Sequence, residues 1–365
     1  MNQRVIFRAD ASVTIGTGHV MRCLTLAHVL RARGAECHFV TRDLPGHLGT
    51  VIAERGFAVS LLPAPSGPAP EGPPAHAAWA GVNWEQDLTD TLAVIPPADW
   101  LVIDHYAFDA RWQQGLGDRV DRVMVIDDLA DRPHAVTLLL DQNLGREAAD
   151  YDGLLPESCQ RLTGPRFALL RPEFAAGRAA ALARRQTSQL EHMMITMGGT
   201  DAIDATSQVL RALKGANLPE GLRISVVMGS RAPALGAVRD LAATIPWPTE
   251  VLVDVREMAA LMTDADLVIG AGGSTNWERC CLGLPGIVVE TAENQARSVA
   301  AMVEADAALG TGLLSEPDFV DRLLGAIRQM QNADYRAESS RRAAAICAGD
   351  GALRVVDILG KKQWK

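Results

Sequence analysis

The sequence lacks any apolar run that approaches the ~20 residues a membrane-spanning helix needs. Its first residues, Met1-Asn2-Gln3-Arg4, lead straight into a short apolar run without the regions of a signal peptide. Lys and Arg are not gathered into a tract, and the formal net charge is −9 at pH 7, which does not favour nucleic acid as a partner. We therefore expect a cytoplasmic protein with no membrane insertion and no nucleic-acid partner.

Cysteine is sparse and is not arranged for metal binding or cross-linking. None of the six cysteines is spaced as C-x-x-C, and the adjacent pair Cys280 and Cys281 is poorly placed for mutual bridging. Asp127 and Asp128 have no histidine or carboxylate partner at a ligand spacing. We expect reduced cysteines, no structural zinc, no catalytic metal and no cofactor.

Short apolar runs alternate with helical patterns along most of the 365 residues, which predicts an α/β protein with parallel sheets. This length suits two doubly wound Rossmann-type domains, and ligands of such sheets bind at the carboxyl ends of the strands, so we expect the two domains to face a central cleft. The expected division is 1–175, 176–340 and a C-terminal helix, 341–365, that packs back on the first domain; a single large α/β domain with a connector is the alternative. The runs that read as strands are 5–7, 37–40, 58–62, 100–103, 123–126 and 138–140, then 193–197, 224–228, 250–253, 267–269 and 286–289.

A proline-rich stretch, Pro63 to Pro74, interrupts the alternation in the first half. Its proline content excludes a regular helix or an inner strand. We expect an exposed loop there.

The junction between the first strand and the first helix carries a histidine framed by glycines. Gly16 and Gly18 permit a tight turn and close backbone approach, and His19 can move a proton near neutral pH. Position 21 is Met rather than the Gly or Ala of a G-x-G-x-x-G fingerprint, which disfavours NAD binding. The alternative is that the glycines only shape a turn and that His19 is a capping residue.

Polar residues also end a later strand of the first half. Asp104, His105 and Tyr106 follow an apolar run, where side chains reach the carboxyl edge of the sheet and can join His19 around one substrate. Hydrogen bonding of Asp104 and His105 to loop backbone is an equally good interpretation. Asp127 and Asp128, at the end of the next strand, are expected to cap a helix or brace a loop.

The second half contains two glycine-rich strand-to-helix turns. Gly198-Gly199-Thr200-Asp201 allows backbone to approach a diphosphate, although an ordinary turn uses the same residues. The segment from Gly270 to Pro285 adds Ser274 and Thr275 to meet phosphate oxygens. Glu278, one turn into the helix, can accept both hydroxyls of a ribose, the alternative being a plain first-turn acid. After the next strand, 290–295 offers amides to sugar hydroxyls.

Taken together, the opening R-x-D-x-S-x-x-I-G-x-G-H-x-x-R, the Ile103-Asp104-His105-Tyr106 strand end and the two turns resemble the UDP-sugar hydrolase family of pseudaminic acid biosynthesis, often called PseG. The resemblance runs from Arg8 to about Gln295. The second-half motif is shared more widely with GT-B glycosyltransferases such as the MurG family, so the resemblance implies a GT-B-like fold. This chain departs from the family at Trp277, which puts a sugar contact by Asn276 in question, and in its longer proline-rich loop.

The resemblance implies metal-independent hydrolysis of UDP-2,4-diacetamido-2,4,6-trideoxy-β-L-altrose to UDP and the free sugar. It implies that His19 is the catalytic histidine with Tyr106 beside it and that the second domain binds UDP. No obligate protein partner is implied. In-line attack by water at the anomeric carbon predicts inversion there. The substrate-binding residues we expect are Arg8, Asp10, Gly16, Gly18, Arg22, Asp104, His105, Gly198, Gly199, Thr200, Asp201, Gly273, Ser274, Thr275, Asn276, Glu278, Asn294 and Gln295.

Two other functions fit the same pattern. A GT-B glycosyltransferase would use the same UDP-sugar donor with an acceptor hydroxyl in place of water. A nucleotide-sugar-binding protein without activity would keep the Glu278 region and lose His19, whereas this chain has both.

Overall fold

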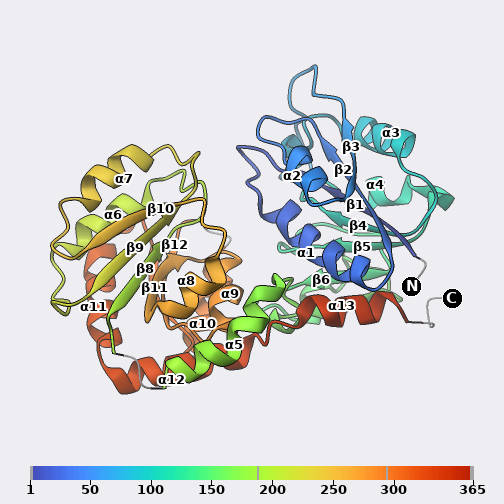
Figure 1. Ribbon diagram of the computed structural model, residues 1–365. Helices are drawn as coiled ribbons and strands as arrows, with labels where there is room; N and C mark the ends of the chain where they lie inside the picture. The colour runs from blue at the N-terminus through green and yellow to red at the C-terminus, as the bar shows by residue number, and fades with distance from the viewer. Residues whose placement is uncertain (1–2, 187–188, 293–294, 362–365) are drawn as a thin grey trace. The chain divides into compact units, whose positions relative to one another are not determined.

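The computed structural model describes residues 3–186, 189–292 and 295–361. The chain forms two compact units: the first runs up to Leu169 and resumes at Asp350, and the second spans Leu170–Gly349 (Figure 1). The expected boundary at 175/176 falls inside helix α5 (Pro172–Arg184).

The first unit contains a seven-stranded parallel sheet in the order β3-β2-β1-β4-β5-β6-β7. Alternate residues of a strand point to opposite faces of the sheet, and two cores result. Val5 and Phe7 pack with α1 and α13, whereas Ile6 packs with α3 and α4. The strands are β1 (Arg4–Ala9), β2 (Glu36–Arg42), β3 (Ala58–Leu62), β4 (Ala98–Asp104), β5 (Val120–Ile126), β6 (Leu138–Asp141) and β7 (Gln160–Thr163), and the helices are α1 (Gly18–Ala32), α2 (Gly49–Glu54), α3 (Trp84–Val94), α4 (Ala110–Gln114) and α13 (Gly351–Leu359).

The second unit contains a six-stranded parallel sheet in the order β10-β9-β8-β11-β12-β13. One of its faces packs on apolar residues of α6, α7 and α11. Its strands are β8 (His192–Thr196), β9 (Arg223–Met228), β10 (Thr249–Val253), β11 (Leu267–Ala271), β12 (Gly286–Glu290) and β13 (Leu309–Leu313). Its other helices are α6 (Ala205–Leu213), α7 (Leu235–Ala242), α8 (Met258–Asp264), α9 (Thr275–Cys281), α10 (Ala296–Glu304), α11 (Phe319–Met330) and α12 (Ala333–Ile346).

Each sheet has one point at which the strand order reverses direction. In the first unit β1 lies between β2 and β4, and in the second β8 lies between β9 and β11. Loops that leave the carboxyl ends of such neighbouring strands diverge to opposite faces and leave a crevice where ligands bind. The predicted glycine turns and His19 follow β1, β8 and β11, so the fold carries all of them to these two points.

Candidate active site

The loop between β1 and α1 delivers His19 to the carboxyl edge of the first sheet. Ser12 and Gly16 close a small turn, in which the Gly16 amide donates to the Ser12 carbonyl at 2.8 Å and the Ser12 hydroxyl accepts from the Ile15 amide at 2.9 Å. Gly16 has φ +80°, a conformation that favours glycine, and His19 is the second residue of α1. The turn therefore fixes where the imidazole emerges from the sheet.

His19 is coupled to a buried carboxylate at the end of β4. Its Nδ1 lies 2.5 Å from Oδ1 of Asp104, which is 0% exposed. Arg22, one turn along α1, donates from Nε and Nη2 to the same carboxylate at 2.6 and 2.7 Å. Burial alone would raise the pKa of Asp104, but the charges of Arg22 and His19 hold that pKa well below its ordinary value. A carboxylate at Nδ1 keeps a proton there, which leaves Nε2 to accept one.

Arg22 links this pair to a second carboxylate at the end of β5. Its Nη2 donates to Oδ2 of Asp128 at 2.7 Å, and the Tyr106 hydroxyl donates to the same oxygen at 2.5 Å. Asn143 donates to the other oxygen at 2.9 Å. Burial raises the pKa of Tyr106, so its hydroxyl stays protonated and remains a donor. The structure thus brings together the predicted residues His19, Arg22, Asp104 and Tyr106, and it adds Asp128.

Arg8, Asp10 and His105 lie beneath this surface. Arg8 pairs with Asp10 at 2.6 Å and with Asp87 of α3 at 2.6 Å, and the exposed fraction of all three side chains is 0%. His105 is 1% exposed, accepts from the Ala107 amide at 3.1 Å, and lies 3.2 Å from Asp10. In this conformation none of these predicted substrate-binding side chains offers a surface to a ligand, and His105 makes the loop-backbone contact of the alternative interpretation.

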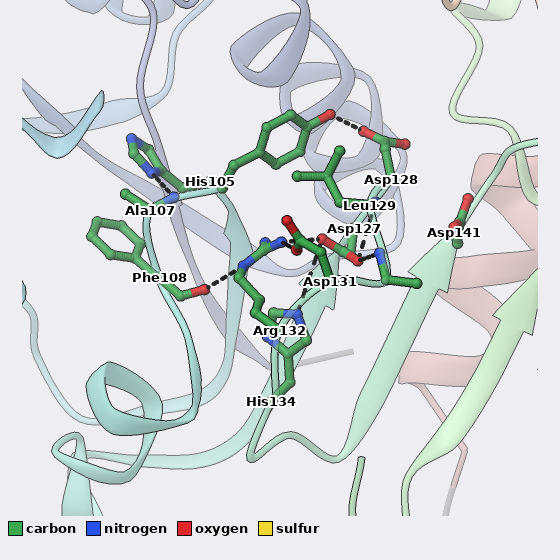
Figure 2. A network of polar contacts seen from close by, with 12 residues as sticks. His105, Ala107, Phe108, Asp127, Asp128, Leu129, Asp131, Arg132, His134 and Asp141 are labelled. Carbon is green, nitrogen blue, oxygen red and sulfur yellow. Dashed lines mark hydrogen bonds and ion pairs between the residues drawn. The ribbon is translucent and has the colours of Figure 1, made fainter. Parts of the chain in front are cut away.

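A neighbouring buried network braces the loop after β5. Figure 2 shows Arg132 beside Asp127 and Asp131, with the Phe108 carbonyl accepting from its Nε. Asp127 also accepts from the Ala130 amide at 2.8 Å, which agrees with the loop-bracing role expected for it. Burial raises the pKa of Asp141, at the end of β6, to about 6.

Three rings from two loops form a wall beside His19. The resemblance implied Tyr106 there, but the sequence did not reveal the other two rings. The aromatic wall consists of His76, Trp79 and Tyr106: Trp79 stacks on Tyr106 at 5.3 Å between centroids, and His76 meets the edge of Trp79 at 4.8 Å. The His19 ring lies 4.7 Å from Tyr106 and 6.1 Å from Trp79. A histidine and a tryptophan directly after a proline-rich run, in a chain that is only 5% aromatic, are the signal that could have pointed to it.

In the second unit, the loop after β8 presents exposed backbone. Gly198 has φ +92°, and Gly198, Gly199 and Thr200 are exposed. Asp201 is 7% exposed, and its carboxylate accepts from the amides of Ala205 and Thr206 at 2.9 and 3.0 Å. Asp201 therefore caps α6, while the three residues before it remain open to a ligand.

The turn after β11, like the loop after β8, has some residues that are exposed to a ligand and others that hold the turn together. Gly273 and Ser274 are exposed and Thr275 is partly exposed. Asn276 is 3% exposed and donates to the carbonyls of Ala271 and Gly273 at 3.2 and 2.9 Å, so it holds the turn together. The Glu278 side chain is 22% exposed and lies 3.9 Å from Arg171, and burial raises its pKa to about 7.

Gln295 closes the loop after β12, because its Oε1 accepts from the amide and hydroxyl of Thr291 at 3.0 and 3.2 Å. Asn294 lies outside the described residues.

The described parts of the chain contain neither a cluster of metal ligands nor a helix that could span a membrane. No group of three or more His, Cys, Asp or Glu side chains among residues 3–186, 189–292 and 295–361 is placed to hold a metal ion. Within those same ranges, every helix is too short or too polar to cross a membrane.

Comparison with curated proteins supports the family resemblance. The chain is 26% identical over 274 residues to the UDP-2,4-diacetamido-2,4,6-trideoxy-beta-L-altropyranose hydrolase of Campylobacter jejuni, a match that covers 75% of this chain and 86% of that protein. It is 27% identical over 196 residues to the spore coat polysaccharide biosynthesis protein SpsG of Bacillus subtilis, over 54% of this chain and 57% of that one. No family model matches. The resemblance to the PseG family that the motifs indicate is confirmed.

Comparison with solved structures identifies the fold. The crystal structure of MurG from Acinetobacter baumannii matches with a TM-score of 0.71 at 16% identity, over 98% of this chain and 99% of that chain. UGT89C1 of Arabidopsis thaliana in complex with UDP matches with a TM-score of 0.66 at 13% identity, over 98% and 100% of the two chains. The predicted GT-B-like α/β fold with two doubly wound halves is confirmed.

Proposed function

We propose that this protein hydrolyses UDP-2,4-diacetamido-2,4,6-trideoxy-β-L-altrose to UDP and the free sugar, in pseudaminic acid biosynthesis. The observation that carries the proposal is the imidazole of His19, held 2.5 Å from the buried carboxylate of Asp104 at the switch point of the first sheet. The similarity to the Campylobacter hydrolase supports the choice of substrate.

In the proposed reaction, His19 acts as a general base. Nε2 takes a proton from water, the water oxygen bonds to the anomeric carbon, and the bond from that carbon to the diphosphate oxygen breaks with its electron pair leaving on UDP. Attack from the side opposite UDP inverts the anomeric carbon. Asp104 stabilises the imidazolium that forms, and general-base action of this kind contributes roughly 10²- to 10⁴-fold in rate.

The second unit supplies the UDP site in this proposal. The exposed backbone of Gly198, Gly199 and Gly273, with the hydroxyls of Ser274 and Thr275, would contact the diphosphate. The Glu278 carboxylate would accept from the ribose hydroxyls. Asp201 and Asn276 shape these turns through the backbone contacts described above.

The first test is turnover by His19→Asn, which keeps a polar side chain of similar reach but removes the base. We expect kcat to fall by about 10²-fold or more while UDP affinity changes little. His28→Asn, on the same helix, is the matched control and should retain activity. In water enriched with ¹⁸O the label should appear in the sugar; label in UDP would show attack at phosphorus, and near-normal turnover of folded His19→Asn would remove His19 from the mechanism.

We also propose that no metal is needed, as the resemblance to the PseG family implies, because the exposed backbone of the glycine turns would stabilise the charge of the diphosphate. Turnover should survive dialysis against EDTA. Loss of turnover that Mg²⁺ or Mn²⁺ restores would contradict this.

A UDP-sugar glycosyltransferase is the second candidate, since the matching structures include the spinosyn rhamnosyltransferase SpnG, at a TM-score of 0.56, and UGT89C1 in complex with UDP, at a TM-score of 0.66. The two functions differ in what accepts the sugar. A transferase would release UDP only when an acceptor hydroxyl compound is added, whereas the hydrolase releases it in buffer alone.

A further inference from the structure

The proline-rich loop continues into a segment that lies beside His19. The proposed mechanism gives this segment no role. The segment leads from the end of β3 to His76 and a short 3₁₀ turn. Two hydrogen bonds anchor it near the two ends of the proline-rich stretch: Arg42 donates to the Pro63 carbonyl at 2.9 Å, and Arg111 donates to the Pro73 carbonyl at 2.9 Å. The segment is thus held in place by side chains of β2 and α4.

These anchors position two rings of the aromatic wall within contact range of a substrate at His19. The indole of Trp79 stacks within 23° of parallel on Tyr106, whose ring stands edge-on to His19. Trp79 itself is 6.1 Å from His19, centroid to centroid. A sugar whose anomeric carbon receives a water from His19 has its ring substituents within a few ångströms of that imidazole, the same range in which Tyr106 and Trp79 lie from it.

His76 brings a polar atom to the same wall. Its Nδ1 is buried and has no hydrogen-bond partner among the residues that the structure describes. Burial lowers the pKa of His76, so that the ring is neutral at pH 7, despite the nearby Asp131 carboxylate. Unlike His105, His76 as a residue is partly exposed, so a ligand can contact its ring, and leaving Nδ1 unpaired is costly.

We infer that Trp79 and His76 recognise an acetamido group of the sugar, the indole packing against its methyl and the imidazole hydrogen-bonding its amide. This inference rests on the proposed function and deepens it. An acetamido group is an apolar methyl joined to a planar amide with one donor and one acceptor, and the wall offers an aromatic surface beside one neutral ring nitrogen. The first unit would therefore select N-acetylated sugars.

The test measures binding of the intact UDP-diacetamido sugar and of UDP, each by calorimetry in a His19→Asn background so that nothing is turned over. Trp79→Leu should weaken the sugar nucleotide about tenfold and leave UDP unchanged. His76→Phe, which keeps the ring packing and removes the nitrogens, should weaken it about fivefold, again without effect on UDP. In the wild-type background both changes should raise KM more than they lower kcat.

Trp84→Leu is the matched control. Trp84 is also partly buried and packs on the same core cluster as Trp79, but its ring neighbour is the Arg111 guanidinium at 5.7 Å rather than His19. Equal effects of Trp79→Leu and Trp84→Leu on sugar-nucleotide binding would overturn the inference, as would unchanged binding in His76→Phe. If the wild-type protein releases no UDP from this substrate, the proposed function fails, which is a separate outcome.

Discussion

At the scale of single residues, the reactivity of His19 depends on which ring nitrogen carries the proton. Asp104 accepts at Nδ1, so Asp104→Asn would present an amide that donates there and moves the proton to Nε2. We predict a loss of about 10²- to 10⁴-fold in kcat with UDP affinity unchanged. Asp99→Asn, at the other end of β4, where Asp99 accepts from the Arg4 amide, is the control. A kcat within a few fold of the wild type in the Asp104 variant would exclude this coupling.

The carboxyl of Glu278 should make nucleotide binding depend on pH. Burial raises its pKa to about 7, and only the ionised form is a full acceptor for the ribose hydroxyls. Because the group is deprotonated above that pKa, we predict that affinity for a UDP-sugar, whose diphosphate diester does not titrate in this range, falls about tenfold from pH 8.5 to 5.5.

Calorimetry in the His19→Asn background measures this pH dependence, and Glu278→Gln should abolish it. Glu173 pairs with Arg171 at 2.8 Å and its charge raises the pKa of Glu278. Glu173→Gln should therefore shift the midpoint to lower pH. If the midpoint of the pH dependence of binding does not change in Glu173→Gln, or if binding still depends on pH in Glu278→Gln, another group is responsible for the titration.

The sequence revealed the candidate residues that belong to short sequence motifs. His19 and Glu278 each follow a glycine-rich turn after a strand, and such turns are visible in sequence. Trp79 and Asp128 reach the site through tertiary packing across distant loops, which no local spacing encodes. The sequence also gave no means to decide whether Arg8 contacts a ligand or lies beneath the site.

At the scale of elements, the expected strands lie within the observed β1–β6 and β8–β12, except that the run 193–197 extends one residue beyond β8. Most of these are inner strands of parallel sheets, which are apolar on both faces. Two strands were not predicted, β7 (Gln160–Thr163) and β13 (Leu309–Leu313). Both lie at sheet edges, where one side is unpaired, and their sequences QRLT and LGTGL lack an apolar run. The other two edge strands, β3 and β10, were expected because their sequences AVSLL and TEVLV do contain such a run, so edge position alone does not remove the sequence signal.

A buried carboxylate links helix α3 to the sheet, and Asp90 of the same helix adds an ion pair with Arg42 at 2.9 Å. Asp87 accepts from Arg8 at 2.6 Å, from Arg42 at 2.8 Å and from the Trp112 indole at 3.1 Å. Without the Asp87 charge, Arg8 keeps Asp10 and Arg42 keeps Asp90 as an ion-pair partner, so two buried guanidinium groups each lose one carboxylate. We predict that Asp87→Asn lowers the free energy of unfolding of the first unit by about 3 kcal/mol.

Urea denaturation followed by hydrogen exchange, which reports each unit separately, measures the effect of Asp87→Asn. Glu85→Gln, on the exposed side of the same helix, is the control and should change stability by less than about 0.5 kcal/mol. A similar loss in both variants would mean that the charge network contributes no more than a surface residue.

At the scale of the whole molecule, the chain crosses between the units twice, at Leu169/Leu170 and at Gly349/Asp350. Each unit encloses its own core, and the last helix adds Val355, Val356 and Leu359 to the core of the first. Two separate cores allow a ligand that contacts one unit to stabilise that unit alone.

This separation leads to a prediction for UDP without a sugar. If UDP binds through the turns after β8 and β11, a concentration 100 times its Kd should stabilise the second unit by about 2.7 kcal/mol. Hydrogen exchange should then slow in β8, β11 and α9, while β1, β4 and α1 exchange as before. Glu278→Gln should reduce the protection at a fixed UDP concentration, and His19→Asn should not. Protection of the turn before His19 by UDP alone would mean that the first unit also binds the nucleotide.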